Sequence, residues 1–118
     1  MKIETPGKFL FAFTGSALAI ALAIHPATAM AQTTPVDLAR KNACLACHGL
    51  VHKQVGPGFA QIAERYRGDG EAAARLAGKI RDGSVGTWGR VIMPRQTQVS
   101  EADAQVLSQW ILSQRPPR

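Results

Sequence analysis

The chain has 118 residues, with 14 lysine and arginine residues against 8 aspartate and glutamate residues, for a formal net charge of +6. This length excludes a large multidomain protein and leaves room for one small domain. Although the charge is basic, no basic run is interleaved with aromatic residues, so we expect no nucleic-acid partner.

Residues 1–31 have the pattern of a secretory signal peptide. Two lysines give a positive start, residues 9–24 form a largely apolar run, and small residues surround Ala29 and Ala31. An uncleaved membrane anchor is the alternative, but the run is shorter than the ~20 apolar residues of a spanning helix and is rich in alanine. We expect cleavage after Ala31, with Ala29 as second choice, and a mature domain of residues 32–118 in the periplasm without a stable membrane anchor.

The mature domain opens with a helix-start signal. Thr34 offers a capping hydroxyl, and Pro35 suits the first helical position. Apolar residues continue toward Ala43. The pattern therefore predicts a helix that runs from Pro35 towards Ala43, with residues 44–48 on its last turn.

Two thiols and an imidazole come next, at Cys44, Cys47 and His48. This spacing is the attachment pattern of a c-type haem. Both cysteines can add to the vinyl groups of one porphyrin, and the adjacent histidine can reach the iron. We therefore predict one covalently attached heme c, with His48 as a ligand of its iron.

Three other interpretations of this motif are weaker. A redox dithiol is expected near a βαβ pattern, and no strand-rich run flanks the motif. A zinc site needs a second ligand pair, and the chain has no further cysteine. A disulfide between Cys44 and Cys47 would leave His48 unexplained.

Residues 49–58 predict a loop, because glycine and proline interrupt them repeatedly. A haem-binding histidine generally donates its other ring N–H to a fixed acceptor. The backbone carbonyl of Pro57 is our candidate acceptor for His48.

Two amphipathic helices are predicted after this loop. Apolar residues recur at helical spacing from Phe59 to Tyr66, and again from Ala73 to Ile80. Glycines between the two segments, and Gly83 after the second, end them.

Residues 83–97 read as irregular chain without a strand, because glycine and proline are closely spaced there. This segment holds Met93, the only methionine that remains if cleavage follows Ala31. Methionine usually fills gaps in a core. Given the haem motif, we instead predict Met93 as the second iron ligand, since methionine opposite histidine is the ligand pair of electron-carrying cytochromes.

The last helix is predicted to open at Ser100, with Asp103 completing a capping box. Ala102, Val106 and Trp110 form its expected apolar row, with Leu107 and Ile111 beside it. We expect Trp110 to pack where this helix crosses the first. The fold class predicted for the mature chain is all-α, with four short helices wrapped around one cofactor.

The order of these features resembles that of the short bacterial class I cytochromes c, which are single-haem periplasmic electron carriers. The resemblance covers nearly all of the mature chain. Its marks are Cys44-Leu45-Ala46-Cys47-His48, Val55-Gly56-Pro57, Gly83-Ser84-Val85-Gly86-Thr87-Trp88-Gly89, Met93-Pro94 and the terminal helix with Trp110.

The resemblance implies a role for each candidate site residue. His48 and Met93 are the axial ligands, Cys44 and Cys47 the thioether attachments, and Pro57 the acceptor for His48.

The resemblance also implies that Trp88 donates its indole N–H to a haem propionate and that Lys79 lies near the same edge. The chain departs from the pattern beside Met93, where Arg90 and Arg95 stand in place of a proline-rich segment. The loop that contains Met93 is also one residue longer than in that family.

These features predict an electron carrier rather than an enzyme. Two axial ligands leave the iron no vacancy for a substrate, and a thioether ligand raises the reduction potential. Two alternatives stay open: a haem subunit of a larger oxidoreductase, and a ligand-binding haem protein with a labile sixth ligand.

We expect a monomer that meets redox partner proteins, such as an oxidase, a reductase or a periplasmic dehydrogenase. The leader holds two of the basic and one of the acidic residues, so the mature chain keeps a net charge of +5. Lys41, Lys53, Arg90 and Arg95 are expected to border the haem crevice and to favour an acidic surface on the partner.

Overall fold

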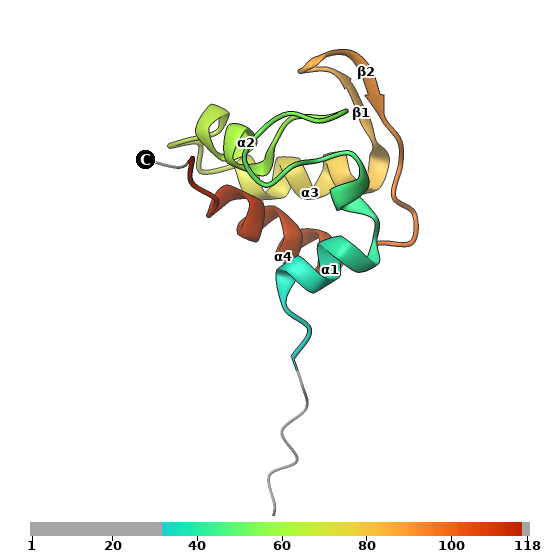
Figure 1. Cartoon of the computed structure of the whole chain (residues 1–118). Helices are drawn as coiled ribbons and strands as arrows, with labels where there is room; N and C mark the ends of the chain where they lie inside the picture. Colours follow the sequence, from blue (N-terminus) through green and yellow to red (C-terminus); the bar gives the residue numbers. More distant parts are fainter. Residues whose placement is uncertain (1–31, 117–118) are drawn as a thin grey trace, which may run out of the picture. The chain divides into compact units, whose positions relative to one another are not determined.

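The structure, a computed structural model, describes residues 32–116, which form four α-helices, one 3₁₀ turn and one two-stranded sheet. The elements in chain order are α1 (Pro35–Lys41), η1 (Cys44–Ala46), α2 (Phe59–Arg65), α3 (Ala72–Asp82), β1 (Ser84–Gly86), β2 (Gly89–Met93) and α4 (Glu101–Leu112) (Figure 1). The predicted signal peptide and its cleavage site lie outside the described residues. In the described part of the chain, no helix has the length and apolarity needed to cross a membrane.

Helix α1 begins as predicted. The Thr34 hydroxyl accepts a hydrogen bond from the backbone N–H of Asp37, and Pro35 takes the first helical position. The hydroxyl therefore satisfies one of the N–H groups that a helix start leaves without a partner.

The predicted extension of α1 to Ala43 is wrong, and the haem motif does not lie on its last turn. The helix ends at Lys41, where the Asn42 amide donates to the carbonyl of Leu38 over 3.0 Å. Ala43 then adopts a left-handed conformation with φ of 56°. Because this conformation cannot continue a right-handed helix, the cysteines begin a separate 3₁₀ turn, η1.

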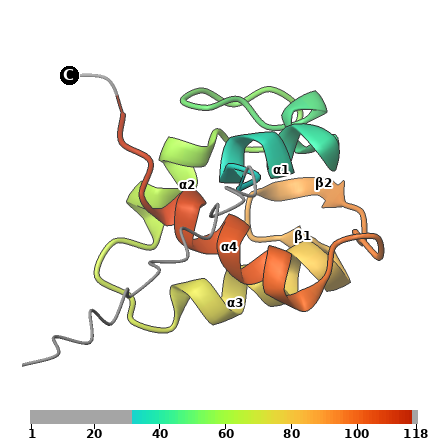
Figure 2. The ribbon, with the colours of Figure 1, turned by 90° about the horizontal axis from the view of Figure 1, so that it is seen from below.

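The helices enclose one apolar core. Helix α4 packs against α1, α2 and α3, and Figure 2 shows its ribbon with α1 on one side and α3 on the other. The predicted apolar faces of α2 and α3 are confirmed. The buried side chains of this core are Leu38, Ala39, Phe59, Ile62, Leu76, Ala77, Ile80, Val99, Ala104, Leu107 and Ile111.

The apolar face predicted for α4 is confirmed only in part. Leu107 and Ile111 are buried as predicted and Trp110 is half-buried, but Ala102 and Val106 are exposed. The other buried members of the face are Ala104 and Ser108. Burial of Ser108 is possible because its hydroxyl donates to the carbonyl of Gln105. Trp110 lies at the edge of this face and meets the ring of Phe59 edge-on, with 5.2 Å between ring centroids.

The segment predicted as irregular chain contains an antiparallel hairpin. Ser84 pairs with Met93 and Gly86 with Gly89, so β1 and β2 lead off the end of α3 (Figure 1). The two glycines have positive φ and allow the tight turn. No proline occurs in β2 before Pro94, so each of its residues has a backbone N–H that could take part in strand pairing. The hairpin is a minor addition to an all-α fold.

Candidate functional site

One cavity brings together every site residue predicted from the sequence. Its inner wall is apolar and includes Phe59, Ile62, Leu76 and Ile80. The predicted residues that line it are Cys44, Cys47, His48, Pro57, Lys79, Trp88 and Met93.

The imidazole of His48 is held from three directions. Its Nδ1 lies 2.7 Å from the carbonyl oxygen of Pro57, and its ring stacks on Phe59 with 5.3 Å between centroids. Against the ring lies Gly56, where a Cβ atom would stand only 2.8 Å from Cε1 of His48. Because a carbonyl oxygen only accepts, Nδ1 carries the proton, and Nε2 is left with a free lone pair that can bind a metal.

Cys44 begins η1 and Cys47 caps its C-terminal end, just before the imidazole. Both are free thiols, Cys44 half-buried and Cys47 exposed. Burial raises the pKa of the Cys44 thiol, which keeps it protonated. Backbone hydrogen bonds from His48 N–H to the Cys44 carbonyl and from Gly56 N–H to the Cys47 carbonyl tie the motif to the loop that follows.

Met93 reaches the cavity as the last residue of β2, not from the irregular loop that the sequence predicted. Its side chain is half-buried and packs against the core. Pairing with Ser84 fixes its main chain beside the end of α3.

Trp88 and Lys79 come from the hairpin turn and from α3. Lys79 Nζ donates to Thr87 Oγ1 over 3.1 Å, which joins α3 to the turn. The guanidinium of Arg65 stands 4.8 Å from the centroid of the Trp88 ring, a cation–π contact. No sequence pattern linked Arg65 to Trp88, because the two residues are far apart in the chain.

Sequence reasoning also missed what Gly56 and Phe59 do. Phe59 was predicted as a core residue of α2, and its stacking on His48 follows only from the path of the loop. The sequence identified Gly56 only as part of Val55-Gly56-Pro57, and its contact with the His48 ring becomes visible only in the folded structure. Both residues restrict the position of the His48 imidazole.

The donor set fits the haem that the motif predicts. Two thiols lie on one short turn, an imidazole with a free nitrogen lone pair follows them, and a thioether enters the same cavity. The apolar inner wall suits a large flat macrocycle, and Lys53 and Lys79 lie among the lining residues where they can face carboxylates.

Comparisons with known proteins agree with this chemistry. The sequence model of the cytochrome c family matches residues 36–115. Cytochrome c-552 of Nitrosomonas europaea is 51% identical over 77 residues, which cover 65% of this chain and 75% of that protein. Cytochrome c-551 of Pseudomonas aeruginosa is 41% identical over 81 residues, 69% of this chain and 77% of that protein.

A solved structure gives the same result for the fold. The crystal structure of wild-type Nitrosomonas europaea cytochrome c552 aligns with a TM-score of 0.66 and 49% identity, over 68% of this chain and 99% of that one. The chain therefore belongs to the cytochrome c family, as a short bacterial class I member with one covalently attached haem and a role in electron transfer.

Proposed function

We propose that this protein is a periplasmic carrier of single electrons, not an enzyme, with His48 and Met93 as the two axial ligands of its haem iron. The observation that carries the proposal is that both side chains line one cavity, His48 with a free Nε2 lone pair. When bound, the haem supplies a one-electron couple between ferric and ferrous iron.

The residues around His48 set the strength and direction of that ligand. The Pro57 carbonyl accepts a hydrogen bond from Nδ1–H of His48 and so increases the basicity of Nε2. Phe59 and Gly56 confine the ring, which keeps the lone pair in one direction. A ligand that does not reorient lowers the structural change that each electron transfer requires.

Met93 supplies a soft thioether that favours the reduced iron and raises the potential. The apolar inner wall excludes water, which raises the potential further. With His48 and Met93 both bound, the iron would have no position left for a substrate, and electron transfer would be the remaining activity.

The other site residues attach and orient the cofactor. Cys44 and Cys47 would form the two thioethers. Their positions at the two ends of the 3₁₀ turn, directly before His48, support this role. Trp88 and Lys79 serve the propionate edge, where the contact of Lys79 with Thr87 holds its ammonium group near the hairpin turn.

Export and partner binding complete the proposal. Residues 1–31 are removed as a signal peptide, and the domain of residues 32–118 acts as a monomer in the periplasm. Its redox partners dock through an acidic surface, which Lys53 at the cavity and the exposed Lys41, Arg90 and Arg95 attract. The reaction rate with the partner is therefore expected to fall as salt concentration rises, and a rate independent of salt would contradict steering.

Optical spectra of the haem-loaded protein test the ligand assignment. We expect a weak red-edge band in the ferric form, which marks methionine sulfur on iron, and no change when carbon monoxide is added to the ferrous form. The variant Met93→Ala should lose the band and bind carbon monoxide. If the unaltered protein lacks the band and binds carbon monoxide readily, the iron has an open face and the carrier proposal fails.

A further inference from the structure

Gly83 lies where the main chain of the Met93 segment passes closest to the end of α3. It follows the last residue of α3 and has φ of +78°. A Cβ atom at this position would stand 2.7 Å from the carbonyl oxygen of Met93 and 3.1 Å from the N atom of Arg95. Both are backbone atoms, so no side-chain rotation can relieve the overlap, and the strand itself would have to move.

Further contacts join the same two segments. Ser84 pairs with Met93, and the backbone N–H of Gln96 donates to the carbonyl of Ile80 over 3.2 Å. Met93 and the segment after it are thus fastened to the last turn of α3 and to β1. A displacement at Gly83 therefore acts directly on the main chain of Met93.

We propose that Gly83 is a positioning residue for Met93. Its missing side chain lets β2 approach the end of α3, and this approach sets the depth at which the Met93 thioether enters the cavity. The inference rests on the proposed ligation by Met93. It adds a residue that neither binds the haem nor lines the cavity.

The chain offers a control for the positive φ at Gly68. Gly68 has the same φ of +78°, but a Cβ atom there would meet nothing within 4 Å. Alanine is strained by the positive φ at either position, and at position 83 the ψ of 174° belongs to a region that is essentially confined to glycine. Only alanine at position 83 also pushes on the Met93 main chain.

The experiment compares haem-loaded wild-type, Gly83→Ala and Gly68→Ala proteins by optical spectrum, reduction potential and carbon monoxide titration. We expect Gly83→Ala to lose roughly half or more of the ferric red-edge band, because Met93 then divides between bound and unbound states. Its potential should fall, and its ferrous form should bind carbon monoxide. Gly68→Ala should keep the wild-type spectrum, potential and resistance to carbon monoxide.

A second measurement covers general instability of Gly83→Ala. Far-ultraviolet circular dichroism of the haem-loaded variant identifies the conditions in which it is folded, and the band is compared with the wild type only there. A wild-type spectrum and potential in folded Gly83→Ala would overturn the role of Gly83, as would an equal loss of the band in Gly68→Ala. Failure of Gly83→Ala to fold in every condition would also overturn it, because the strain would then act on the whole domain and not on Met93 alone. Absence of the band from the wild-type protein would instead refute Met93 ligation itself.

Discussion

The two regions that supply the proposed iron ligands hold them in different ways. In the His48 region, residues 44–59, the side chain itself is fixed. The residue is only 8% exposed, and its ring is hydrogen-bonded to Pro57 and stacked on Phe59. In the Met93 region, residues 83–96, the contacts are made by the main chain at Ser84 and Gln96, and the Met93 side chain is half-buried.

His48 is thus oriented by contacts of its own side chain, whereas Met93 is oriented by the path of the strand that carries it. A substitution near His48 should act by moving a ring. One near Met93 should act by moving backbone, and the thioether follows. We therefore expect the bond to Met93 to yield before the bond to His48 when the protein is perturbed.

The largest effect is expected from replacing both Cys44 and Cys47 with alanine, which removes the covalent attachment that both regions share. Most of the cavity wall would then face water, and a domain this small has little other core to compensate. We expect the protein without haem to be largely unfolded by far-ultraviolet circular dichroism.

The single variant Cys47→Ala is the control, because it leaves one thioether and both proposed axial ligands. It should remain folded with haem bound. A double variant that keeps a stable native fold without haem would show that the cofactor is not needed to hold the two regions together.

Much of the fold followed from local sequence signals, and the errors have local physical causes. The start of α1 at Thr34 depends on a short-range cap and was predicted correctly. Its end depends on the left-handed conformation of Ala43, and alanine carries no signal for that conformation. The hydrophobic pattern found Leu107 and Ile111 on the buried face of α4 but missed Ser108, whose hydroxyl donates to the Gln105 carbonyl within the helix.

The site was easier to predict by residue type than by geometry. The spacing of Cys44, Cys47 and His48 identifies a haem from chemistry alone. In the sequence, Gly56 and Gly83 can be identified only as loop glycines. The residues near each glycine in the sequence do not reveal which atoms lie beside it in the fold. Such contacts appear only when the chain path is known.

A substitution at Gly56 tests the His48 side of the comparison. In Gly56→Ala, the new Cβ atom would stand 2.8 Å from Cε1 of the His48 ring, which cannot turn away because Pro57 and Phe59 hold it. Overpacking of this kind costs about 1–3 kcal/mol. We expect that loss in the free energy of unfolding, measured by chemical denaturation of the haem-loaded protein.

Gly70→Ala is the matched control, because a Cβ atom at Gly70 meets nothing within 4 Å and its φ is not positive. We expect its stability to stay near that of the wild type. In Gly56→Ala the red-edge band should remain, since Met93 is untouched. An unchanged stability for Gly56→Ala would mean that the ring moves freely and that the contrast between the regions is overstated.

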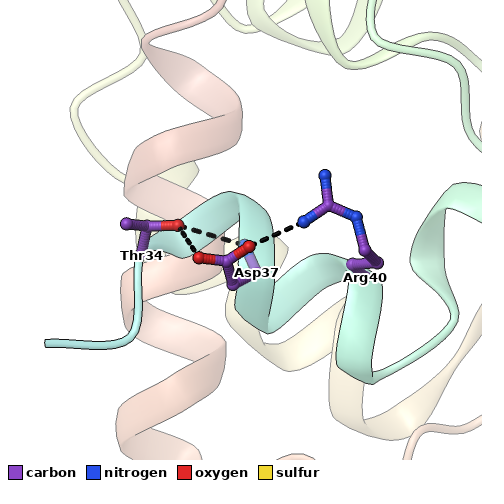
Figure 3. A network of polar contacts seen from close by, with 3 residues as sticks. All are labelled: Thr34, Asp37 and Arg40. Atoms are coloured by element: carbon purple, nitrogen blue, oxygen red, sulfur yellow. Dashed lines mark hydrogen bonds and ion pairs between the residues drawn. The ribbon is translucent and has the colours of Figure 1, made fainter. Parts of the chain in front are cut away.

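The smallest effect is expected at the start of α1, away from both ligand regions. Asp37 accepts hydrogen bonds from Thr34 Oγ1 and Arg40 Nη1, each over 2.6 Å (Figure 3). The hydrogen bond from Thr34, followed by the charge of Arg40, holds the pKa of Asp37 below its ordinary value of 3.8. A carboxyl with a lowered pKa in the folded state stabilises the protein above its unfolded-state pKa, and this contribution disappears as pH falls through the folded-state pKa.

Asp37→Asn should therefore reduce stability near neutral pH and reduce it progressively less as pH falls below 3.8. Unfolding curves at a series of acidic pH values measure this, with Glu71→Gln as a control that removes another exposed carboxylate. The red-edge band of Asp37→Asn should equal that of the wild type at every pH where both are folded. A change in the band would show that the start of α1 affects the bond between Met93 and the iron. The position of the main chain at the end of α3 would then not be the only factor that determines this bond.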